Sequence, residues 1–266
     1  MTETILTLYC PLIFLIAINS GLLGSFVLWK KYSNMSESIS HFSVLGATIS
    51  FLFSYNMNLM IFITSVIYVA LLYMMRKRFS SDTLVALFAN IGLALALVLS
   101  AFFNKVRVDF MSLLFGDILL ANQNDLISLS ITTFIILVVT IFNWKKIILT
   151  ILNADLAKSK SINTSLIDFF IITSIVAYIT IAVKIIGAIL LSSMLILPAA
   201  TASMVTSNPK RMVLLSMVLS LLSQITGMLV SLLHDLSTSG SIALCSFVIF
   251  CVLGIFATLK TSLSRQ

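Results

Sequence analysis

The chain has 266 residues, of which 60% are hydrophobic and only 9% are charged, and its mean hydropathy is +1.15. Soluble globular domains carry about 25% charged residues, so this composition excludes an ordinary soluble domain. The net charge of +7 comes from basic clusters between apolar runs, which indicates membrane orientation rather than a nucleic-acid partner. The three cysteines lack C-x-x-C spacing, so neither a disulfide framework nor a thiolate zinc cluster is predicted.

Nine apolar runs follow one another along the chain, each near the length that crosses a bilayer as a helix. They cover residues 5–29, 38–55, 58–75, 83–103, 126–142, 165–183, 185–207, 212–233 and 240–259. Several of the runs are short. The sequence therefore predicts an all-α, polytopic transmembrane bundle of eight or nine helices, forming one membrane domain over residues 1–266.

The basic residues give an independent estimate of the number of crossings. With nine crossings and the N-terminus outside, thirteen of the sixteen Lys and Arg residues face the cytoplasm, leaving Lys105, Arg107 and Lys184 outside. Cytoplasmic loops of membrane proteins are enriched in Lys and Arg, so this asymmetry favours nine crossings. Eight crossings would require the 185–207 run, or one of the short runs, to be re-entrant.

Glu37 and His41, at the start of the second run, are separated by one helical turn and share a helix face. A carboxylate with an imidazole is a common ligand set for zinc or manganese, and ionisable groups near a span are candidates for function. The alternative is that Glu37 is a first-turn acid stabilised by the helix dipole and His41 a core residue. Two ligands do not fill a metal site, so other helices or water would have to complete it.

Two further polar positions have weaker signals. His234 and Asp235 are adjacent, so their side chains point to different faces, and helix capping with turn formation is favoured over a shared metal ion. Asn90 lies inside the fourth run, where its carboxamide is expected to hydrogen-bond between helices or to donate an oxygen ligand.

The seventh run ends in Pro198-Ala199-Ala200-Thr201-Ala202. Proline removes a backbone donor, which predicts a bent or interrupted helix whose freed backbone groups need partners. Such an interruption is typical of a part of a membrane protein that moves. The alternative is that these small residues only pack helices together.

Enzymatic signatures are missing from the sequence. It contains no G-x-x-x-x-G-K-[ST] phosphate loop, no H-E-x-x-H zinc-protease motif and no G-x-S-x-G nucleophile elbow. The chain is therefore not expected to hydrolyse ATP, and energy for uphill transport would come from a partner or from an ion gradient.

Four separate segments resemble one family, the membrane permease subunits of bacterial ABC transporters that import zinc, manganese or iron(II). These segments are Ser40–Gly46, Val108–Leu119 followed by Asp125-Leu126, Val183–Ala188 with Leu195–Ala202, and Asp235–Ser241. Their order and spacing agree along nearly the full chain, and the pattern is most similar to the zinc-uptake members.

The resemblance implies a homodimeric permease in the bacterial inner membrane, in contact with lipid, with the transport pathway between the two copies. It implies an ABC ATPase subunit below each copy and a periplasmic or surface-tethered binding protein that delivers the metal. No permanently bound cofactor is implied, only a transported divalent ion. The family's acid and histidine on the second helix correspond to Glu37 and His41, and its cytoplasmic coupling element corresponds to residues 198–209.

Two departures bear on the metal. The family acid is commonly Asp, whereas Glu37 is one methylene longer, and zinc-type members often place a histidine where this chain has Asn90. Manganese or iron(II) permeases are therefore alternatives. Outside this family, a proton-coupled secondary transporter, a membrane scaffold without transport, and a siderophore or cobalamin permease also remain open.

Overall fold

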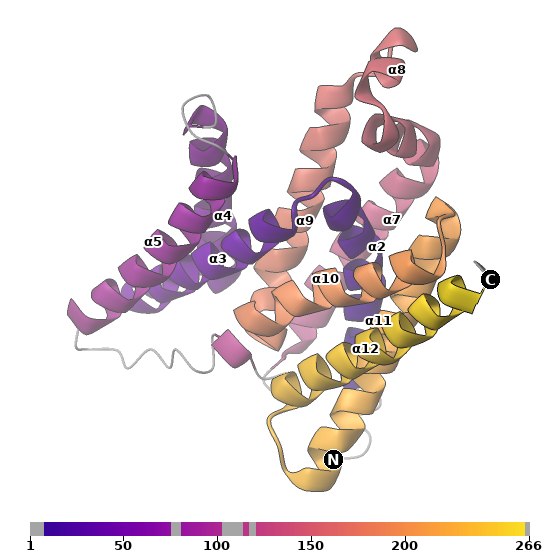
Figure 1. Ribbon diagram of the computed structural model, residues 1–266. Helices are drawn as coiled ribbons and strands as arrows, with labels where there is room; N and C mark the ends of the chain where they lie inside the picture. Colours follow the sequence, from indigo (N-terminus) through magenta and orange to yellow (C-terminus); the bar gives the residue numbers. More distant parts are fainter. Residues whose placement is uncertain (1–7, 76–80, 103–113, 117–120, 264–266) are drawn as a thin grey trace. The chain divides into compact units, whose positions relative to one another are not determined.

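The computed structural model describes residues 8–75, 81–102, 114–116 and 121–263, and these residues form helices joined by short connections (Figure 1). The helices are α2 (Cys10–Trp29), α3 (Ser33–Phe53), α4 (Met57–Met75), α5 (Ser81–Phe102), α7 (Gln123–Leu152), α8 (Ala154–Ser159), α9 (Thr164–Ile186), α10 (Ala188–Val205), α11 (Pro209–His234) and α12 (Thr238–Leu263). The predicted all-α fold is confirmed. Most of the 108–119 segment lies outside the described residues.

Within the described residues, eight helices are long and apolar enough to cross a membrane, and they match eight of the nine predicted runs. The remaining run, 38–55, falls mainly in α3, whose many serine and threonine side chains lower its hydropathy. Several of these hydroxyls donate to the carbonyl four residues earlier, as Ser43 does to Ile39 (2.7 Å) and Thr48 to Val44 (2.9 Å). Such bonds satisfy the hydroxyls inside the helix, so α3 can be buried despite its polarity.

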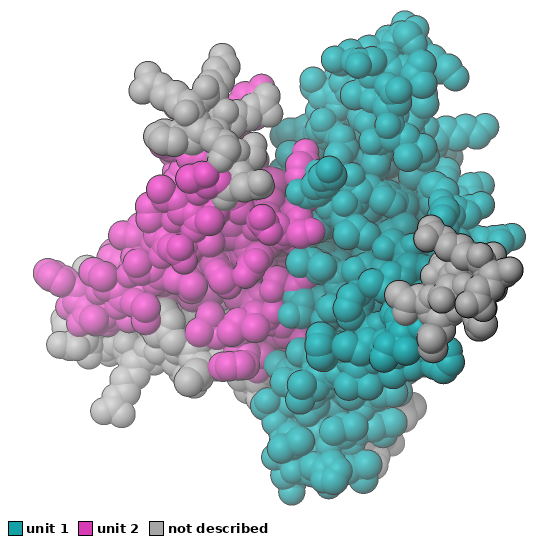
Figure 2. Space-filling view, viewed as in Figure 1, with its two compact units in different colours: residues 1–31, 122–175, 193–266 teal, residues 32–121, 176–192 magenta. Residues whose placement is uncertain are grey.

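The chain divides into two compact units, coloured separately in Figure 2. Unit 1 consists of residues 1–31, 122–175 and 193–266, and unit 2 of residues 32–121 and 176–192. The two later boundaries fall inside α9 and α10, so neither unit is one continuous piece of chain.

In unit 1, α2 is the most enclosed helix: Leu12, Ile16, Leu23 and Phe26 are fully buried. The buried amide of Asn19 donates to the hydroxyl of Thr133 on α7 over 2.6 Å. Polar side chains that bond between helices in this way help to hold membrane bundles together.

The structure corrects the predicted interruption at Pro198. Helix α10 continues through this buried proline from Ala188 to Val205. The break lies earlier, at Gly187, which has a φ of +80°. There the chain still forms backbone hydrogen bonds on both sides, from Gly187 to Val183 (2.9 Å) and from Leu191 to Gly187 (3.1 Å). A proline costs one helical bond, whereas a left-handed residue ends the helical repeat.

Candidate functional site

One face of α3 is polar near the start of the helix. Asn34, Glu37, Ser38 and His41 follow the three- and four-residue spacing that places side chains on one side of a helix. All four line a single cavity within unit 2. The structure therefore brings the predicted acid and histidine to the same space.

The opposite wall of the cavity comes from α5. It consists of Val85, Ala86, Ala89 and Asn90, which enclose with α3 a volume of about 300 Å³. The two alanines leave room that larger residues would fill. Asn90, for which the sequence predicted an interhelical hydrogen bond or a role as an oxygen ligand or gate residue of the pathway, lines the same cavity as Glu37 and His41.

Two contacts fix α3 against α5 at this cavity. The hydroxyl of Ser38 donates to the carbonyl of Val85 over 2.9 Å, which sets the register of the two helices. One turn further along α3 and two turns further along α5, Gly92 faces the backbone of Phe42, where an added Cβ would lie only 3.0 Å from the Phe42 Cα. Since carbon atoms pack best at about 3.5–4.0 Å, a larger residue at this position would push the helices apart.

An aromatic cluster next to His41 joins α3, α4 and α5. The rings of Phe42 and Tyr68 are 5.4 Å apart and tilted, and those of Tyr68 and Phe88 are 5.9 Å apart and edge-on. Arrangements of this kind stabilise aromatic pairs beyond the burial of their surface. The wall that carries His41 is therefore packed against two other helices.

The cavity offers one carboxylate, one imidazole and two carboxamides. Glu37 and Asn90 are exposed and His41 is half-buried, so a solute could reach all three. Within the described part of the chain, no group of three or more His, Cys, Asp or Glu residues is placed to hold a metal ion. The set can supply part of a divalent cation's coordination shell and leaves positions for water or a second molecule.

His234 and Asp235 lie at the end of α11, in unit 1. Asp235 has left-handed backbone angles and its N–H bonds to the carbonyl of Ser231, whose hydroxyl donates to the Leu236 carbonyl over 2.7 Å. The geometry is that of a helix end followed by a turn. Neither residue lines the cavity of Glu37 and His41.

The predicted ATPase-coupling residues are mostly enclosed. Pro198, Ala199, Thr201 and Ala202 are buried, and only Ala200 is partly accessible. They form no separate short helix, because α10 runs to Val205 and three residues connect it to α11. The exposed residues near this connection are Ser203, Met204, Val205, Ser207, Asn208, Lys210 and Arg211.

The sequence prediction missed Asn34 and Ser38. Both share the face of Glu37 and His41 by spacing, and this was the available signal. Ser38 holds the two walls together, and Asn34 adds a second carboxamide to the lining.

Known proteins resemble this chain over most of its length. The ABC 3 transport family model matches residues 5–257. The high-affinity zinc uptake system membrane protein ZnuB of Haemophilus influenzae is 33% identical over 88% of this chain and 90% of its own length. The manganese transport system membrane protein MntC of Listeria innocua is 27% identical over 91% of this chain and 87% of its own length.

A solved structure agrees with the fold. PsaBC from Streptococcus pneumoniae in complex with Fab superposes with a TM-score of 0.84 and 22% identity, covering 95% of this chain and 93% of that chain. The likeness extends over almost all of both chains, and the helices found here are those expected of a multi-pass membrane protein. The chain belongs to the ABC 3 transport family and is the bacterial inner-membrane permease of a metal-ion ABC importer, without enzymatic activity of its own.

Proposed function

We propose that the chain carries zinc, and that Glu37 and His41 bind the ion transiently on its way to the cytoplasm. The observation that carries this proposal is that both side chains line one cavity, opposite Asn90. Carboxylate and imidazole are both zinc ligands. The relative with 33% identity is a zinc uptake protein, whereas the manganese protein has 27% identity.

A small number of protein ligands suits a transport pathway. An ion must bind strongly enough to enter and weakly enough to leave. Four protein ligands would hold zinc in a closed tetrahedral site, as in structural zinc centres. With Glu37, His41 and water as its ligands, zinc can exchange, and the chain retains no permanent cofactor.

Energy is expected to come from a separate ABC ATPase, and the metal from a periplasmic binding protein. In this proposal two copies of the chain form the pathway, and the ATPase docks on the exposed residues 203–211. The small residues from Pro198 to Ala202 then link that contact to the helix bundle, because they pack closely within unit 1. Closure of the ATPases would shift the spans and exchange the gates.

The test measures ATP-dependent zinc uptake by the whole transporter in proteoliposomes. We expect Glu37→Gln and His41→Ala each to lower the uptake rate by about tenfold or more, the change that a loss of about 1.4 kcal/mol of binding to the ion in transit produces. His234→Ala is the matched control because the chain has only two histidines and His234 does not line the cavity. Uptake unchanged in both cavity variants, at normal assembly, would refute the proposed role.

Manganese is the second candidate for the transported ion. The position of Asn90 in the cavity lining favours it. A carboxamide oxygen at the cavity suits a harder ion than zinc. Competition between the two metals during uptake decides between these cargos. A proton-coupled transporter would instead lose uptake when the proton gradient is collapsed and would work without the ATPase.

A further inference from the structure

A second pocket lies within unit 1, at the end of the bundle that carries most of the basic residues. It has a volume of about 400 Å³ and lies between α7, α9 and the connection that follows α8. Its polar lining includes Asn143, Lys146, Lys160, Ser161 and Asn163. The positive-inside pattern predicts that this end lies on the cytoplasmic side.

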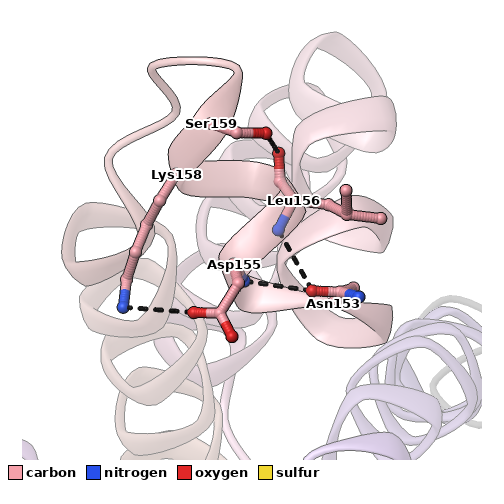
Figure 3. A network of polar contacts seen from close by, with 5 residues as sticks. All are labelled: Asn153, Asp155, Leu156, Lys158 and Ser159. Carbon is pink, nitrogen blue, oxygen red and sulfur yellow. Dashed lines mark hydrogen bonds and ion pairs between the residues drawn. The ribbon is translucent and has the colours of Figure 1, made fainter.

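Backbone hydrogen bonds fix α8 and the turn after it, which contributes to the pocket wall. The amide of Asp155 donates to the Asn153 side chain, which caps the start of α8 (Figure 3). At the other end of α8, Ser161 donates to Lys158 (2.9 Å) and Ile162 to Ala157 (3.0 Å).

These two bonds form the Schellman pattern that ends helices, with Ser161 at the left-handed position and a φ of +57°. A residue other than glycine or asparagine is uncommon there. Hydrogen bonds of this turn therefore fix the backbone of Lys160 and Ser161, which both line the pocket.

Within the part of the chain that the structure describes, two ammonium groups at this pocket, those of Lys146 and Lys160, have no acidic partner. The two acids in this stretch of sequence pair with other lysines: Asp155 with Lys158 at 3.7 Å (Figure 3), and Asp168 with Lys30 at 2.5 Å. Within the described residues, neither Lys146 nor Lys160 forms an ion pair. Among the described residues, the pocket lining therefore holds two positive charges and no acidic side chain.

The rest of the lining is apolar. Val139, Ile162, Leu166, Ile167 and Phe170 complete the wall. Large apolar side chains nearby on the same helices are exposed, notably Phe142 (83%) and Phe169 (69%). Membrane helices present such side chains to acyl chains, so cationic and lipid-facing surfaces meet at this pocket.

We propose that this pocket binds the phosphate headgroup of an anionic glycerophospholipid from the cytoplasmic leaflet. Lys146 and Lys160 bind the phosphate, while the acyl chains lie along the exposed apolar surface of α7 and α9. Basic pockets between membrane helices on the cytoplasmic side suit such headgroups. A free phosphate ion would use the lysines but not the apolar wall, and a soluble protein would not use the lipid-facing side chains.

The test uses the full-length permease, purified in detergent, stripped of lipid and exposed to phosphatidylglycerol or phosphatidylcholine. Native mass spectrometry counts retained lipid, and thermal unfolding measures its stabilising effect. The pocket variant is Lys146→Gln with Lys160→Gln. The matched control is Lys145→Gln with Lys158→Gln, which removes the same charge from neighbouring residues outside the pocket lining.

We expect the unchanged protein and the control to retain phosphatidylglycerol in preference to phosphatidylcholine, and the pocket variant to bind it about tenfold more weakly. Both variants should unfold at the same temperature when no lipid is added, which separates lost binding from misfolding. Any of three results would overturn the proposal: equal loss of lipid in both variants, equal binding of the two lipids, or full competition by inorganic phosphate. Unchanged lipid binding with weakened ATPase association in the pocket variant would assign the pocket to protein contact instead.

Discussion

A glycine pair in unit 2 gives the most direct test of the packing. Gly187, between α9 and α10, and Gly116 both have positive φ, +80° and +65°. Each approaches the other's backbone so closely that a Cβ would overlap it: at Gly187 the added carbon would meet Phe115 and Gly116, and at Gly116 it would meet Ile186 and Gly187. Neither position has room for a methyl group.

The expected cost of Gly187→Ala follows from these two features. A left-handed conformation costs an alanine about 1–2 kcal/mol, and overpacking against backbone costs about 1–3 kcal/mol. Alanine also lowers the conformational entropy of the unfolded chain, which offsets about 0.4–1 kcal/mol of this loss in the free energy of unfolding. The net loss is about 1–4.5 kcal/mol, which lowers the unfolding temperature by roughly 2–9 °C for a chain of this size.

Thermal unfolding of the purified variants in detergent provides the assay. Gly116→Ala should cost a similar amount, and the double variant should cost less than the sum, because both methyl groups open the same contact. Gly254→Ala is the control, since its Cβ would meet its nearest neighbour, the Met204 sulfur, at an ordinary 3.5 Å. An unchanged unfolding temperature for Gly187→Ala, or strictly additive losses in the double variant, would refute the reasoning.

Two further predictions concern polar contacts between helices. Ser38→Ala removes the hydrogen bond to Val85, so it should lower the free energy of unfolding by about 0.5–1.5 kcal/mol and also lower metal uptake. The hydroxyl of Ser40 bonds within its own helix, so Ser40→Ala should leave uptake unchanged. Equal uptake by both variants would contradict this prediction. A thermal-unfolding cycle of Asn19→Leu and Thr133→Val should give a coupling of about 0.6–2 kcal/mol, and additive losses would show that their 2.6 Å contact contributes nothing.

The sequence predicted the site only in part. Glu37 and His41 could be paired from their spacing because residues one helical turn apart must share a face. Asn90 could not be added to them, since its helix is joined to α3 through α4 and the pairing of α3 with α5 depends on side-chain fit. The contact of Ser38 with Val85 and the absence of a side chain at Gly92 create that fit.

The helix break shows the same limit. Pro198 is the stronger breaker by residue type, but it lies inside a continuous helix, and the break occurs at Gly187. Packing decided the outcome: the residues from Pro198 to Ala202 are largely buried, whereas Gly187 makes the close backbone contact with Gly116. A local propensity of a few kcal/mol is readily outweighed by such contacts.

The sequence by itself determined that the chain forms membrane helices and where they lie, because the length of an apolar run and the placement of Lys and Arg act locally along the chain. Only the tertiary structure decided that Asn34, Ser38 and Asn90 join Glu37 and His41 at one cavity, and that Lys146 and Lys160 border one pocket in unit 1. These arrangements depend on which helices pack together and how closely, and close packing is a property of pairs of surfaces that no single run of residues contains.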